Sequence, residues 1–148
     1  MSNPIVTGLR SVEIAVPDLT DATRFYEECW GLEVAEKHGS SVYLRGTGQE
    51  HHALVLHEGG EKKLLAVNLA AQNKSVVDGL YEKAKGLGAS LGAPKALEGP
   101  SGGYGFIFHD LHDRDYCISA DLKRHEAKPD ARDRPIKLSH VVLNSPDR

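Results

Sequence analysis

Histidine is the residue type in this sequence best suited to metal or acid–base chemistry, and five of the eight histidines fall in two groups. The groups are His51, His52 and His57, and His109 and His112. On a helix, a His-x-x-His spacing places two imidazoles on one face, where they can share a metal ion. Here Asp110 and Asp113 are typical turn formers, so the second group is predicted to lie in a turn between strands. Neither group by itself predicts a metal site.

Two further features have structural explanations. The glycine-rich run of residues 98–105 (EGPSGGYG) lacks both a following Lys-Ser/Thr pair and a helix amino terminus, so it predicts a loop and no phosphate site. Cys29 falls on the apolar side of a predicted helix, where a thiol is usually inert. No Ser-His-Asp or activated-cysteine arrangement is legible. The sequence therefore shows no self-sufficient nucleophilic site.

Composition narrows the class of protein. The chain has 148 residues, 40% of them hydrophobic and 26% charged, which is an ordinary globular balance. The net charge is −3 and the basic residues form no stripe, so neither nucleic acid nor an anionic membrane surface is an expected partner. The longest apolar runs are as short as residues 53–56, and the amino terminus has no signal-peptide pattern. With two cysteines and no disulfide framework, we expect a cytoplasmic protein.

The histidines and cysteines named above lie within a predicted structural unit that occurs twice in the chain. Residues 9–16 alternate as a strand with Val12, Ile14 and Val16 on one face and Ser11, Glu13 and Ala15 on the other. A helix follows, with Thr20 as a candidate cap, an apolar face and Gly31 as the stop. That face is Ala22, Phe25, Tyr26 and Cys29, with Trp30 nearby as a candidate domain or subunit contact. Strands are predicted at 32–36, 41–45 and 53–57.

The same order begins again at residue 64. Residues 64–70 predict a strand, and Ser75–Asp78 has the shape of a capping box. The apolar face of this second helix is Val77, Leu80, Ala84 and Leu87, and Gly88 is its stop. Short strands are predicted around 89–91, 95–97, 105–108 and 116–120. The chain therefore predicts one domain over residues 1–120, made of two copies of one unit at 8–58 and 64–120.

The composition changes after this repeat. Residues 121–135 are charged, carry two prolines and have little apolar content, which predicts an interdomain linker, with a frayed tail as the alternative. Residues 136–148 return to an apolar strand ending in Pro-Asp, much like the first strand. We expect this to be the first strand of a second domain. Its apolar part, Lys137–Leu143, is predicted to be disordered or to pair with an exposed sheet edge, including that of a neighbouring chain.

Three phrases of the sequence resemble a known family. LSHVVLNSPD (138–147) resembles the opening of the catalytic domain of extradiol, ring-cleaving dioxygenases of the vicinal-oxygen-chelate superfamily. VYLRGTGQEHHALVLHEG (42–59) resembles the third and fourth strands of their non-catalytic first domain, and GGYGFIFHDLHDRDYCIS (102–119) resembles the end of that domain in a degenerate form. The resemblance implies an α+β fold of two βαβββ modules that form a cup-shaped, incompletely closed mixed β-barrel.

The resemblance also implies a chemistry. Ring opening of a catechol-like substrate by O2 uses Fe(II), less often Mn(II), held by two histidines and one carboxylate that leave open coordination sites. His140 matches the first of these histidines, and the other two ligands are expected beyond Arg148. The fragment alone is therefore expected to bind no metal and to be inactive. By analogy the parent enzyme is expected to be a homo-oligomer.

Within the present domain, the positions that match the family's ligand-bearing places are Glu13, Asn68 and Cys117. An asparagine and a thiol are more often structural residues than members of a two-histidine, one-carboxylate set. Two alternatives to the dioxygenase remain open. One is a free-standing, bleomycin-resistance-type protein that binds a small molecule in the cup, and the other is a glyoxalase-like metal isomerase, which would need strong ligands at these three positions.

Overall fold

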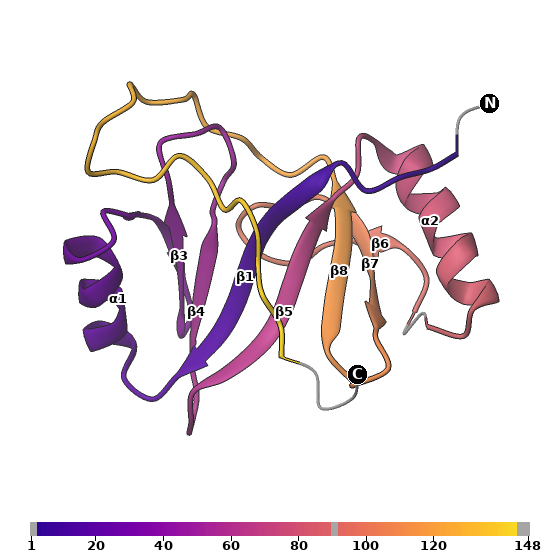
Figure 1. Ribbon diagram of the computed structural model, residues 1–148, viewed down its shortest axis with the longest axis horizontal. Coiled ribbons are helices and arrows are strands. Elements are labelled where there is room, and N and C mark those ends of the chain that lie inside the picture. Colours follow the sequence, from indigo (N-terminus) through magenta and orange to yellow (C-terminus); the bar gives the residue numbers. More distant parts are fainter. Residues whose placement is uncertain (1–2, 90–91, 145–148) are drawn as a thin grey trace.

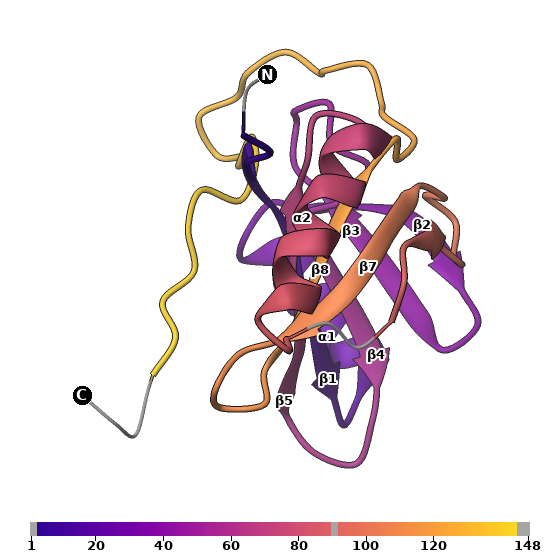
Figure 2. The same ribbon diagram turned by 90° about the vertical axis from the view of Figure 1, so that its right-hand side faces the viewer.

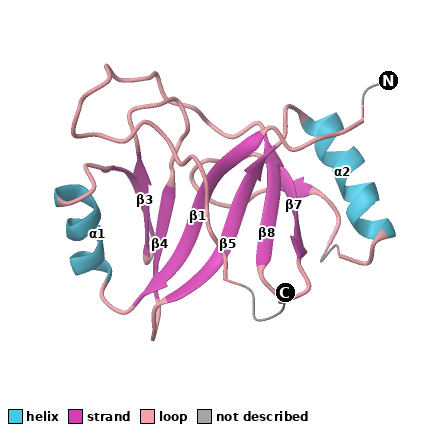
Figure 3. Ribbon diagram, in the orientation of Figure 1, coloured by secondary structure: helices cyan, strands magenta, loops and turns pink. Residues whose placement is uncertain are grey.

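The order strand, helix, strand, strand, strand occurs twice in the computed structural model, which describes residues 3–89 and 92–144 (Figure 1; Figure 3). The first unit consists of β1 (Gly8–Val16), α1 (Leu19–Glu28), β2 (Glu33–His38), β3 (Ser41–Arg45) and β4 (Leu54–Glu58). The second consists of β5 (Lys63–Ala70), α2 (Lys74–Gly86), β6 (Lys95–Ala96), β7 (Tyr104–His109) and β8 (Asp115–Ala120).

All strands of the described ranges join one mixed sheet in the order β2-β3-β4-β1-β5-β8-β7-β6. The strands β1 and β5 pair antiparallel at its centre, and each also pairs in parallel with the last strand of its own unit. The order ends at β2 and β6, so the sheet is not closed into a barrel. Figure 2 shows α2 lying along one face of the second half of the sheet. The predicted α+β fold of two βαβββ modules is confirmed.

The alternation of β1 sorts its side chains onto two faces as predicted. Val16 belongs to the apolar core beneath α1, and Val12 and Ile14 pack against it. Ser11 is fully buried on the other face, where Glu13 also lies among polar partners. Because successive strand residues point to opposite faces, one strand serves both an apolar layer and a polar interior.

The helix caps differ from those predicted. Asp18 caps α1 by accepting a hydrogen bond from the Asp21 backbone, and Thr20 lies inside the helix. Asn73 caps α2 by accepting from the Val76 backbone, so the predicted capping box at Ser75 is wrong. In both cases a good cap residue lies two positions upstream of the predicted one. Within the described ranges, neither helix is long and apolar enough to span a membrane.

The predicted helix stops are confirmed, whereas one predicted strand is not found. Gly31 and Gly88 follow α1 and α2 with positive φ angles of 72° and 71°, a conformation that glycine adopts without strain. Of the strand predicted at 89–91, residues 90 and 91 lie outside the described residues, and Ala89 belongs to no strand. The next strand, β6, has two residues.

Each helix covers its own half of the sheet, but its apolar face is narrower than predicted. In α1 the face toward the sheet is formed by Leu19, Ala22, Thr23 and Tyr26, which follow helical spacing. Cys29 is exposed and Phe25 is half-exposed because both lie on the flank of that face. In α2, Val77, Leu80 and Ala84 pack inward, whereas Leu87 lies beyond the last helical turn and is 84% exposed.

Residues 121–138, called the strap below, run from the end of β8 back across the first module (Figure 1). The strap makes backbone hydrogen bonds to the β3–β4 loop, including Thr47 N to Pro135 O at 2.9 Å and Gly48 N to Ile136 O at 3.0 Å. Glu33 pairs with Lys128 and with Arg134 of the strap. This segment is therefore anchored on the first module.

The apolar segment after the strap forms no strand within the range that the structure describes. Residues 136–144 belong to no helix or strand and include a bend at Lys137, and 145–148, the end of the predicted strand, lie outside the described residues. That this segment begins a second domain, and that it pairs with another sheet edge, both stay predictions.

Candidate functional site in the cup

The polar faces of the central strands enclose a cavity of about 340 Å³, called the cup below. In the sheet register Ser11 pairs with Asn68, and Asn68 pairs with Cys117. Glu13 lies two residues after Ser11 on the same face, so the structure brings Glu13, Asn68 and Cys117 together around one space. These are the three positions that the family resemblance singled out.

Glu13 is held at both carboxylate oxygens. His57 Nε2 lies 2.8 Å from Oε1, and Asn68 Nδ2 donates to Oε2 at 2.9 Å. His57 Nδ1 lies 2.6 Å from the Ser41 hydroxyl, and Asn68 Nδ2 also lies 2.8 Å from the Ser11 hydroxyl. Because buried polar groups are stable when their hydrogen bonds are made within the protein, this arrangement satisfies Glu13 without a metal ion.

Cys117 is not prepared to bind a metal either. Burial, reinforced by the nearby Glu13 carboxylate, raises the pKa of the Cys117 thiol to about 11. The thiolate is the form that ligates metals, and at neutral pH this side chain keeps its proton. Among the residues described, no group of three His, Cys, Asp or Glu side chains is arranged to hold a metal ion. The donor set of the cup therefore does not fit the family's metal.

A second polar network, which the sequence reasoning missed, lies beside the cup. His51 Nε2 lies 2.9 Å from Glu36, His51 and His52 approach each other at 2.8 Å between their Nδ1 atoms, and the His125 ring stacks on His51 at 5.1 Å. The hydrogen bond from His51 lowers the pKa of Glu36. Burial lowers the pKa of His52 to about 3, so its imidazole is neutral at physiological pH.

This network connects the strap to the first module. His125 belongs to the strap, its Nε2 lies 2.9 Å from the His51 carbonyl oxygen, and its backbone donates to Gln49. A hydrogen bond between the Nδ1 atoms of His51 and His52 requires one of the two imidazoles to donate and the other to accept. The adjacent pair of histidines in the sequence was the available signal, but their partners come from distant segments.

Arg10 closes one end of the cup and was also missed. Its guanidinium is buried, with Nη1 paired to Glu50 at 2.8 Å and Nη2 donating to the Ser119 carbonyl at 3.1 Å. A buried arginine needs such partners because burial of an unpaired charge is costly. An arginine within a predicted strand was the only signal for this contact in the sequence.

The family model that describes the glyoxalase/bleomycin resistance protein/dioxygenase superfamily matches residues 8–118, which span the first module and the second as far as Ile118 of β8. The chain belongs to this superfamily. No curated protein sequence matches it.

Two solved protein structures are similar in fold to this chain. The Mn(II)-bound glyoxalase from Novosphingobium aromaticivorans is similar with a TM-score of 0.90 and 32% identity, over 96% of this chain and 48% of that chain. Homoprotocatechuate 2,3-dioxygenase from Arthrobacter globiformis is similar with a TM-score of 0.75 and 24% identity, over 84% of this chain and 39% of that chain. The latter likeness shows the fold alone. The chain thus spans half or less of the length of these structures.

The second histidine group, His109 and His112, and the candidate ligand His140 lie apart from the cup. His109 ends β7, and the turn after it is organised by Asp110, which accepts hydrogen bonds from the backbones of His112 and Arg114. The predicted turn is confirmed. His140 is exposed on the segment beyond the strap, and its predicted role as a metal ligand stays a prediction.

Proposed function

We propose that this chain is the non-catalytic first domain of a two-domain extradiol dioxygenase, which opens catechol-like aromatics with O2 and a metal, Fe(II) before Mn(II). The observation that carries the proposal is the state of the cup. Glu13 is engaged by His57 and Asn68, and Cys117 is protonated, so the positions corresponding to metal ligands are occupied by a hydrogen-bonded network. Membership of the superfamily and the share of the solved structures that the chain spans also support the proposal.

In this proposal the chain's own residues position the start of the second domain. The strap is fixed by Glu33 and by the backbones of Thr47 and Gly48. His140 lies four positions after Ile136, which accepts a hydrogen bond from Gly48, and it is assigned as the first of three metal ligands. A facial set of two imidazoles and one carboxylate leaves sites for a bidentate substrate and O2, which is the chemistry that the metal would supply.

A second candidate is supported by a specific observation. The glyoxalase from N. aromaticivorans is 32% identical and contains Mn(II), so the parent protein would be a metal-dependent glyoxalase instead. A third is a bleomycin-resistance-type binder, for which the support is the cup itself, a cavity of about 340 Å³ lined by polar groups. Measurements of O2 consumption and metal content distinguish the three candidates. The dioxygenase consumes O2, the isomerase does not, and the binder needs no metal.

The test begins with anaerobic loading of the 148-residue chain with Fe(II) or Mn(II), followed by desalting and metal analysis. We expect no retained metal and no coloured ring-opened product from catechols. The product of the complete reading frame is then expected to retain about one metal per chain and to consume O2 with a catechol.

In that complete protein, His140→Ala should remove the metal, while His38→Ala, at an exposed position of β2, should not. One metal held tightly by the 148-residue chain, and lost in Glu13→Gln, would contradict the proposal. A complete protein that retains metal but consumes no O2 would favour the isomerase.

A further inference from the structure

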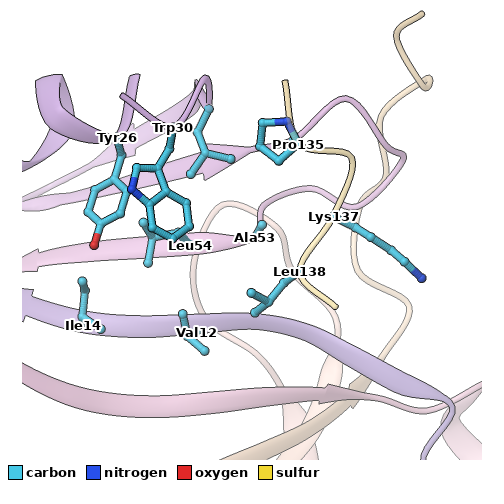
Figure 4. A pocket seen from close by; sticks show the side chains of 11 residues that line it. Val12, Ile14, Tyr26, Trp30, Ala53, Leu54, Pro135, Lys137 and Leu138 are labelled. Atoms are coloured by element: carbon cyan, nitrogen blue, oxygen red, sulfur yellow. The ribbon is translucent and has the colours of Figure 1, made fainter. Parts of the chain in front are cut away.

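A second cavity, of about 200 Å³, lies on the opposite face of β1 from the cup. Its floor is formed by Val12 and Ile14 of β1 and by Leu54 of β4, and Val12 and Leu54 are neighbours in the parallel register. Figure 4 shows Tyr26 and Trp30 on one side of this cavity and Leu138 of the strap on another. We call it the α1–strap pocket.

The lining of this pocket is almost entirely apolar. The rings of Tyr26 and Trp30 meet edge to face, with their centroids 5.5 Å apart. Lys137 is the charged residue at the rim, and in Figure 4 its ammonium group points away from the apolar side chains. A charged ligand would lose its hydration here without gaining an ionic partner, which is costly.

The strap wall of the pocket is fixed through its backbone. Pro135 and Ile136 accept hydrogen bonds from Thr47 and Gly48, so the strap beside the pocket is held by backbone contacts in addition to its ion pairs with Glu33. Gly46 also lines the pocket, and a Cβ atom added there would lie 2.4 Å from the Ile136 oxygen. The close approach of the two backbones therefore requires glycine.

We propose that the α1–strap pocket binds a small uncharged aromatic molecule, a single ring with at most a short alkyl substituent. The size agrees, since a dry apolar cavity of roughly 150 Å³ in another protein accepts benzene. The aromatic side chains offer edge-to-face contacts to such a ring, and the aliphatic floor offers a flat apolar surface. The pocket lies outside the cup and uses neither His140 nor a metal, so its binding test is separate from the test of the proposed metal chemistry, although Lys137 and Leu138 of its wall belong to the segment predicted to begin the second domain.

Trp30 makes the test direct because it is the single tryptophan of the chain. Toluene is titrated into the 148-residue chain while Trp30 emission is recorded, with benzoate as the charged probe of the same ring. We expect a saturable change with toluene and none with benzoate at equal concentration. Sedimentation at each end of the titration reports the oligomeric state.

Two variants locate the site. Ala53→Leu adds bulk inside the pocket and should weaken toluene binding roughly tenfold or more, whereas Ala127→Leu adds the same bulk at an exposed position of the strap and should leave binding unchanged. Because Ala53 is buried and its variant can misfold, Leu138→Ala serves as the second test. It removes one wall from outside the core and should weaken binding about threefold to tenfold.

Several results would overturn the proposal. A linear, non-saturable response to toluene would show that no site exists, and equal binding of benzoate would refute the uncharged class. Retention of binding in both Ala53→Leu and Leu138→Ala would place the site elsewhere. A chain that self-associates through Trp30 and binds no toluene would show that a second copy fills the pocket.

Discussion

The two modules have the same topology, but they differ in the length of the helix and in the segments that pack beside it. In each, the first strand pairs in parallel with the last, and a helix covers the outer face. In the second module α2 has 13 residues and packs Val77 against Phe106 and Ile118. In the first, α1 has 10 residues, and Trp30, just after it, is 56% exposed. The strap lies beside α1, and the α1–strap pocket remains between the strap and the helix.

The difference shows which parts of the molecule are determined by the repeat. The alternating apolar pattern specifies the strands and their order in both halves. The contact of His125 with His51 and the α1–strap pocket exist only because a segment from outside the repeat lies on the first module. A shared module therefore defines the scaffold, and the segment added to it defines the remaining polar and apolar spaces.

The largest effect is expected in the apolar core of the first module. Leu56→Ala removes a fully buried side chain of the first module and should lower the free energy of unfolding by about 3 to 4 kcal/mol. Because β1 and β5 join the modules in one sheet, Trp30 fluorescence and far-UV circular dichroism should report one coincident denaturant transition. Separate transitions would show that the modules are independent. Leu111→Ala, at a side chain that is 98% exposed, is the control and should change stability little.

The second prediction concerns the loss of stability at acidic pH that is caused by His52, a buried residue of the first module. The folded-state pKa of His52 is lowered to about 3 from 6.5, so the unfolded chain binds a proton that the folded chain excludes. Stability contributed by the neutral imidazole is complete above pH 6.5 and is lost as the pH falls toward 3, with a slope of about 1.4 kcal/mol per pH unit. The measurement is denaturant unfolding at a series of pH values. A His52→Gln variant should flatten this dependence, and an unchanged slope in that variant would exclude His52 as its origin.

A third substitution separates the strap from the module beneath it. Gly46→Ala places a Cβ atom 2.4 Å from the Ile136 oxygen, so the strap must shift at a cost of about 1 to 2 kcal/mol. We expect faster amide hydrogen exchange at Thr47 and Gly48, with the sheet amides of β5 and β8 unchanged. Gly60→Ala, where nothing lies within 4 Å of the added atom, is the matched control. Unchanged exchange at Gly48 would show that the strap is held by other contacts.

The smallest effect on the structure is expected from chemical modification of the two cysteines. Cys29 is exposed, whereas burial raises the pKa of Cys117 to about 11, so roughly one Cys117 thiol in a thousand is ionised near pH 8. Alkylation followed by mass spectrometry should find Cys29 modified at least about tenfold faster. Equal rates in native protein would mean that the second module opens readily, and denatured protein provides the reference rate for each thiol.

Much of the fold could be predicted from the sequence because it depends on local patterns. The alternation of β1 and the stops at Gly31 and Gly88 follow directly from strand periodicity and from the conformations open to glycine. The caps were misplaced because Asp18 and Asn73 compete with equally suitable residues two positions later. Only the packing of each helix on the sheet decides between such candidates.

The candidate site was predictable only in part. Family resemblance identified Glu13, Asn68 and Cys117, and the register of three adjacent strands brings them together. The partners of those residues were not predictable, because His57 reaches Glu13 from a strand 44 positions away. The same holds for His125, which meets His51 across a separation of 74 residues. Hydrogen bonds between distant segments leave no periodic trace in a sequence.

The central position of β1 has a consequence for the order of events during synthesis. The ribosome releases β1 before every other strand, yet Val12 pairs with Leu54 on one side and with Val67 on the other. Neither neighbour exists when β1 emerges, because Leu54 follows Val12 by 42 residues and Val67 follows it by 55. During that interval the nascent chain presents two open strand edges, which are sites of aggregation. A ribosome-associated chaperone that shields the first sixteen residues would therefore act at the stage where this protein is most vulnerable.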